Sequence, residues 1–130
     1  MAEKLPREYE TQMEKFAFQH ALVEILKVSS RANKYIDETT PWLLFKEGKR
    51  ARLASVLYNL IETIRICTVL LQPFIPDSCK EIFEQINALG KLIDFDSTLS
   101  FGKFHKNTSV NKGDIIFPRF DIAKELAGLE

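Results

Sequence analysis

The residues of this chain that could do chemistry gather around its single tryptophan. Trp42 follows a Thr-Pro pair and precedes a local excess of positive charge. The basic side chains are Lys46, Lys49, Arg50 and Arg52, with Glu47 as the one acidic residue among them. An exposed indole can stack on an unpaired base, and lysine and arginine can contact the phosphates that lead to it. The same residues also fit a tryptophan packed in the core beside a solvated charged corner.

No other part of the sequence has the pattern of a catalytic or metal site. His20 and His105 have no companion at ligand or triad spacing, and no Gly-rich phosphate loop occurs. Asp94 and Asp96 are too weak a signal for acid–base chemistry. Residues 112–119 contain a Gly-Asp pair that suggests a ligand loop, but their mainly apolar character favours a closing peptide with a structural role.

Composition indicates one ordinary globular domain. The 130 residues are 45% hydrophobic and 28% charged, with a net charge of zero. This balance argues against a strong autonomous nucleic-acid binder but leaves room for a local basic patch. Cys67 and Cys79 form no CxxC pair, so we expect two small buried thiols, no zinc site and a reducing cytoplasmic setting. No apolar run is long enough to predict a membrane span or a signal peptide.

Hydrophobic periodicity predicts an all-α bundle of about four or five helices. Apolar residues recur at spacings of three and four over residues 4–15, in a second stretch that ends near residue 35, and over residues 49–72 and 77–89. Between the second and third stretches, Thr40 is expected to cap a short helical turn over residues 41–46 that begins at Pro41. The long helix is expected to bury Leu53, Leu57, Leu60, Ile64 and Leu71.

The C-terminal part of the chain loses the helical period. We expect the bundle to end near residue 90 and residues 91–130 to form a long, mostly non-helical strap that wraps along it. Apolar residues scattered among turn-forming residues over positions 92–121 predict packing against the bundle. A short strand is expected at residues 114–117 and a helical turn at residues 122–129.

Four strings stand in a characteristic order. They are RANKYIDETTPW at residues 31–42, RLASVLYNLIETIR at residues 52–65, LLQPFIPD at residues 70–77 and IIFPRFD at residues 115–121. In this order and spacing they resemble the C-terminal anticodon-binding helical domain of methionyl-tRNA synthetase. The resemblance implies that Trp42 stacks on the wobble cytosine of the methionine anticodon and that Pro41 shapes the same surface. Together with the adjoining basic corner, it gives five candidate RNA-binding residues, which are Pro41, Trp42, Lys46, Lys49 and Arg50.

The sequence also departs from the family pattern. The catalytic half of the family, with its HIGH and KMSKS motifs for ATP, is missing, and so is a preceding helix with an Asn-x-x-x-Arg pair that reads anticodon bases. We therefore expect a fragment of an ATP-using ligase that has no cofactor of its own and activates no methionine. Its expected partners are the anticodon stem-loop of methionine tRNA and the missing catalytic domain of the same chain.

A rival hypothesis remains open at this point. The chain could be a helical protein-interaction or structural domain that does not bind RNA, which the zero net charge slightly favours. The exposure of Trp42 separates the two hypotheses. An indole open to solvent beside Lys46 and Arg50 supports RNA binding, whereas a fully buried one removes the stacking surface.

Overall fold

The architecture was determined from a computed structural model that describes residues 2–105, 109–117 and 121–128. Within these ranges every regular element is helical, which confirms the predicted all-α fold. The elements are α1 (Leu5–Glu14), α2 (Phe18–Thr39), α3 (Pro41–Lys46), α4 (Arg50–Leu71), α5 (Pro76–Ile86), the 3-10 helices η1 (Gly90–Ile93) and η2 (Phe95–Leu99), and α6 (Ile122–Ala127).

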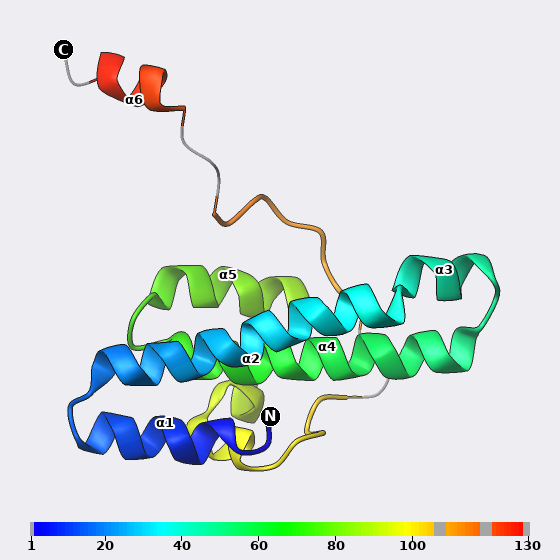
Figure 1. The fold of residues 1–130 in the computed structure, drawn as a ribbon, viewed down its shortest axis with the longest axis horizontal. Coiled ribbons are helices and arrows are strands. Elements are labelled where there is room, and N and C mark those ends of the chain that lie inside the picture. The colour runs from blue at the N-terminus through cyan, green and yellow to red at the C-terminus, as the bar shows by residue number, and fades with distance from the viewer. Residues whose placement is uncertain (1, 106–108, 118–120, 129–130) are drawn as a thin grey trace.

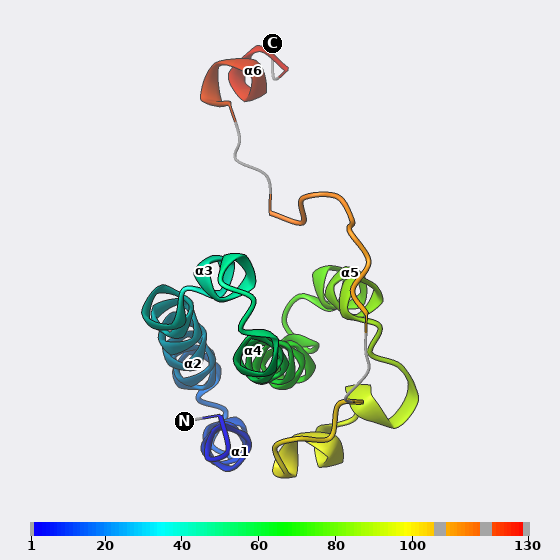
Figure 2. The ribbon, with the colours of Figure 1, turned by 90° about the vertical axis from the view of Figure 1, so that its right-hand side faces the viewer.

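The long helix α4 is the centre of the bundle. In Figure 1, α2 and α4 run side by side, with α1 beneath α2 and α3 at the far end of both. Figure 2, which looks along the helices, places α4 between α2 on one side and α5 on the other. Consecutive helices therefore pack on one another or on α4, as short connections favour.

Backbone-restricting residues mark most helix boundaries. Pro41 and Pro76 occupy the first turns of α3 and α5, where a missing N–H costs no hydrogen bond. The second helix runs to Thr39, four residues beyond the predicted end, and α5 ends at Ile86, three residues before the predicted end. Asn87 ends α5 in the left-handed conformation that is common after the last residue of a helix, with φ of 58°.

Two hydrophobic clusters meet at α4. The first joins α1, α2 and α4 through Leu5, Tyr9, Ala21, Ile25, Val28, Ile66, Cys67 and Leu70. The second joins the C-terminal part of α4 to α5 and the following segment through Val69, Cys79, Phe83, Ile86, Ala88 and Phe104. Because both clusters use α4, its C-terminal half is buried on nearly all sides.

The prediction of the buried face of α4 was partly wrong. Leu60 is buried as predicted, and Leu53 and Leu71 are half-buried. Leu57 and Ile64 are instead 43% and 40% exposed. The helix has apolar residues around most of its circumference, so periodicity alone did not decide which of them face α2 and α5.

A buried ion pair lies on α4 at two positions that the predicted buried face did not include. Glu62 and Arg65 are both fully buried, and Arg65 donates two hydrogen bonds to the Glu62 carboxylate, at 2.6 and 2.8 Å. The same guanidinium donates to the carbonyl of Leu92 at 2.8 Å and to the hydroxyl of Ser97 at 2.7 Å. One carboxylate oxygen of Glu62 accepts hydrogen bonds from the backbone N–H groups at positions 102 and 103, both at 3.1 Å. The pair therefore attaches residues 92–103 to α4.

The strap prediction holds for only part of its length. Residues 92–104 pack on the bundle, where Phe104 is buried and its carbonyl accepts a hydrogen bond from the Tyr58 hydroxyl at 2.9 Å. Two short 3-10 helices, η1 and η2, lie at the start of this strap, and the rest of its described part before α6 is non-helical, as predicted. Residues 109–114 reach the end of α5 through polar contacts, such as the Asn111 N–H donating to the Gln85 carbonyl at 2.7 Å.

Three apolar residues within and after this stretch do not pack as predicted. Ile115 is 81% exposed, and Val110 and Phe117 are also exposed. No strand forms within residues 114–117, whereas the predicted C-terminal turn is present as α6. In Figure 1 the chain leaves the bundle after its contacts with α5, and α6 lies apart from the other helices.

One helix of the described residues, α4, is long and apolar enough by composition to cross a membrane. A buried core helix of a globular domain passes the same test, and α4 contains the buried ion pair of Glu62 and Arg65. Its composition is accounted for by its central place between two hydrophobic clusters.

Candidate nucleic-acid interface

The short helix α3 presents apolar side chains to solvent instead of burying them. Four of its six residues are large and apolar, yet none of the six is buried. Trp42 is 55% exposed, Phe45 is 75% exposed, and only Leu44 among the apolar four is half-buried. Packing against the core therefore does not explain the composition of α3, and the indole of Trp42 has a free surface.

A strained residue sets the position of this helix. Thr40 has φ of 43°, in the left-handed region, where a β-branched residue is an outlier that costs about 1–3 kcal/mol. Its N–H donates to the carbonyl of Ile36 at 2.9 Å and ends α2, while its own carbonyl accepts from the N–H of Leu43 at 2.9 Å and starts α3. The predicted capping by the Thr40 side chain is wrong, because no such hydrogen bond forms. Strain of this kind concentrates at functional sites, and here it directly precedes Pro41 and Trp42.

A glycine turns the chain from α3 into α4. Gly48 has φ of 73°, which favours glycine, and nothing stands within 4 Å of the position that a side chain would take. The Lys49 N–H donates back to the carbonyl of Leu44 at 3.0 Å. The turn brings the start of α4 next to α3.

The basic residues lie where they are electrostatically unfavourable for folding. Lys49 precedes the first residue of α4, and Arg50 and Arg52 stand in its first turn, which contains no acidic residue. Because the N-terminus of a helix already carries about half a positive charge, these cations raise the local positive potential instead of offsetting it. The exposed ion pair between the Lys49 amine and the Glu47 carboxylate, at 2.9 Å, offsets only part of that charge. Such a corner attracts anions, and phosphate in particular.

The structure brings four of the five candidate residues to one exposed corner. Trp42, Lys46, Lys49 and Arg50 are exposed over α3 and the beginning of α4, and Pro41 is half-buried at the base of α3. Lys46 lies one helical turn after Trp42 and therefore on the same side of α3. The exposure of Trp42 is what the RNA-binding hypothesis requires of it.

The remaining candidates of the sequence form no site. His20 and His105 are exposed, on α2 and after η2, and Asp94 and Asp96 are exposed at the 3-10 helices. Most of residues 112–117 are exposed, and the last two positions of the proposed closing peptide, 118 and 119, lie outside the described residues.

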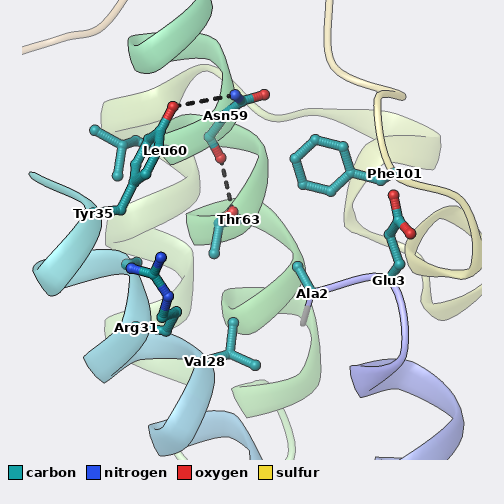
Figure 3. A pocket seen from close by; sticks show the side chains of 10 residues that line it. Ala2, Glu3, Val28, Arg31, Tyr35, Asn59, Leu60, Thr63 and Phe101 are labelled. Atoms are coloured by element: carbon teal, nitrogen blue, oxygen red, sulfur yellow. Dashed lines mark hydrogen bonds between the residues drawn. The ribbon is translucent and has the colours of Figure 1, made fainter. Parts of the chain in front are cut away.

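An open groove of about 450 Å³, which the sequence did not indicate, lies between α2 and α4 (Figure 3). Arg31 and Tyr35 line it from α2, Asn59 and Thr63 from α4, and Phe101 from the segment after η2. The Asn59 amide donates to the Tyr35 hydroxyl at 3.3 Å and joins the two walls. Tyr35 and Asn59 are 24 residues apart in the sequence, so spacing alone gave no signal for their pairing.

Comparison with known proteins identifies the family. A family model described as the anticodon binding domain of methionyl tRNA ligase matches residues 1–125. The methionine–tRNA ligase of Caldanaerobacter subterraneus subsp. tengcongensis is 50% identical over 131 residues, which cover 100% of this chain and 20% of that protein. The ligase of Clostridium acetobutylicum is 42% identical over 130 residues, covering 99% of this chain and 20% of that protein.

A solved structure agrees with these relatives. The free state of Mycobacterium tuberculosis methionyl-tRNA synthetase superposes with a TM-score of 0.80 at 28% identity, covering 92% of this chain and 24% of that one. The chain thus spans about one fifth of the length of the curated relatives that it matches. Family model, relatives and fold agree, and the chain belongs to the family of anticodon-binding domains of methionyl-tRNA ligases.

Proposed function

We propose that this chain binds the anticodon stem-loop of methionine tRNA, with Trp42 stacking on an unpaired anticodon base. The observation that carries the proposal is the half-exposed indole on α3, a helix that buries none of its residues. Stacking of a base on an aromatic side chain contributes about 1–3 kcal/mol. The family resemblance supports the wobble cytosine as that base.

The basic corner has a different role in this proposal. Lys46, Lys49 and Arg50 contact the phosphates next to the stacked base, drawn by the positive end of α4. Such contacts position the RNA and carry no sequence information. Discrimination between anticodons therefore rests on Trp42, and overall affinity rests largely on the basic side chains.

We propose further that the parent protein is a methionine–tRNA ligase of the cytoplasm, in which a catalytic domain outside this chain uses ATP to attach methionine. The curated relatives, which are about five times the length of this chain and carry that name, support this assignment.

The test is aminoacylation by the full-length protein of methionine tRNA and of a version with a mutated anticodon. We expect Trp42→Ala to reduce the preference for methionine tRNA over the mutated version by about 5- to 150-fold, the equivalent of roughly 1–3 kcal/mol. Methionine activation, measured as pyrophosphate exchange, should be unchanged. An unaltered preference would show that Trp42 does not read the anticodon.

Matched variants in the basic corner separate stacking from phosphate contact. Lys46→Ala and Arg50→Ala should weaken the binding of both tRNAs to the same extent and reduce the salt dependence of that binding. A change in anticodon preference in either variant would contradict the assignment of these side chains to phosphates.

A further inference from the structure

A second exposed aromatic side chain stands on the same side of α3 as Trp42. Phe45 follows Trp42 by three residues, so the helix places it on the same face, about 4.5 Å further along the axis. It is 75% exposed, which leaves more of its surface in solvent than Trp42 has. Neither the core nor the contact of Trp42 with a single base uses this ring.

The surroundings of Phe45 distinguish it from an ordinary exposed hydrophobic residue. Single apolar side chains on a surface need no explanation. Phe45, however, shares its face of α3 with the exposed Trp42 and with Lys46, and the basic N-terminus of α4 follows directly. Two flat rings beside several cations match a ligand that combines planar groups with negative charge, as single-stranded nucleic acid does.

We propose that Phe45 is a second stacking surface, which holds the base next to the one on Trp42. This inference rests on the proposed function and adds a residue to it. The separation of about 4.5 Å along α3 is of the same order as the roughly 3.4 Å between successive nucleotides on one strand of a duplex. Two neighbouring bases of an open loop can therefore each meet one ring.

The test uses the full-length protein and an RNA hairpin with the sequence of the methionine anticodon stem-loop. Phe45→Leu keeps an apolar side chain but removes the aromatic face. We expect it to raise the Kd about fivefold or more at fixed salt. Phe16, 80% exposed at the turn between α1 and α2 and thus at the opposite end of α2 from α3, provides the control (Figure 1). Phe16→Leu should leave the Kd unchanged.

Hairpins with one abasic position in the loop identify the base involved. The loss caused by Phe45→Leu should disappear when one particular base is removed. That base should be adjacent to the one whose removal abolishes the loss caused by Trp42→Leu. Because Trp42 is the only tryptophan, quenching of its fluorescence by the hairpin should persist in Phe45→Leu.

The outcomes separate this inference from the proposed function. If Trp42→Leu weakens binding and Phe45→Leu does not, the proposed function stands and the second stacking surface is refuted. If neither variant changes the Kd, both are refuted. If Phe45→Leu lowers the thermal stability but keeps the affinity for the hairpin, the ring makes a protein contact and the inference is overturned. The inference is also overturned if Phe16→Leu raises the Kd as much as Phe45→Leu does.

Discussion

Removing the buried charge of Arg65 should destabilise the domain more than almost any other single substitution. Its guanidinium is fully buried and donates to Glu62, to the carbonyls at positions 92 and 97, and to the Ser97 hydroxyl. In Arg65→Met the side chain keeps much of its volume, but the Glu62 carboxylate stays buried without its counter-charge. Breaking a buried pair in this way costs about 3–5 kcal/mol. A domain of this kind is stable by only about 5–15 kcal/mol in total.

Urea unfolding followed by far-ultraviolet circular dichroism measures this loss. The chain contains a matched control, because Lys27 and Glu24 form an ion pair with the same spacing of three residues, at 2.9 Å, on the exposed side of α2. We expect Lys27→Met to leave the unfolding midpoint unchanged, because exposed pairs contribute little. An Arg65→Met variant within about 1 kcal/mol of the wild type would refute the reasoning, as would an equal loss in Lys27→Met.

A double substitution tests whether the loss comes from the orphaned carboxylate. Glu62→Gln removes the charge but keeps an oxygen that can accept from the N–H groups at positions 102 and 103. Glu62→Gln combined with Arg65→Met should therefore be more stable than the sum of the two single losses predicts, by about 1 kcal/mol or more. Simple additivity would mean that the pair itself is not the source of the effect.

Three further predictions concern the core. Leu60→Ala should cost about 2–5 kcal/mol in urea unfolding, whereas Leu57→Ala, at a half-exposed position three residues earlier, should cost clearly less; equal losses would contradict the packing of α4. Burial raises the pKa of Cys67 to about 12 and that of Cys79 to about 11, from 9.0, so both thiols should react slowly with iodoacetamide at pH 8 until urea is added. Because the folded state holds these protons more tightly than the unfolded state, the free energy of unfolding should fall as pH rises from about 9 towards 12. A flat or rising profile over that range would show that the thiols do not lose protons on unfolding as described.

The sequence predicted the helices well because their boundaries depend on local chemistry. Pro41, Gly48 and Pro73 limit what the backbone can do wherever the rest of the chain lies. The buried face of α4 was harder to predict, since Leu57 and Ile64 have the same spacing pattern as residues that are buried. Their exposure depends on where α5 and α2 pack, which no local pattern contains.

Long-range partners explain the other errors. Glu62 and Arg65 look like an exposed pair on a helix, and their burial follows from hydrogen bonds to residues 27 to 41 positions away. At the candidate site, residue types were enough to select Trp42 and the basic corner. The left-handed conformation of Thr40 could not be predicted, because β-branched residues rarely adopt it. The position of Phe45 on the same face as Trp42 could have been predicted from their spacing of three residues.

The lack of buried residues in α3 has a consequence for how this domain can change over time. Left-handed residues at both ends, Thr40 and Gly48, hold the helix in place through the backbone. Its outward side chains can therefore be replaced with little loss of folding stability. Most substitutions elsewhere in a protein lower a stability that is already small. Under the proposed function, new preferences for neighbouring loop bases would arise at positions 42, 45 and 46 one substitution at a time. The scaffold separates the evolution of recognition from the maintenance of the fold.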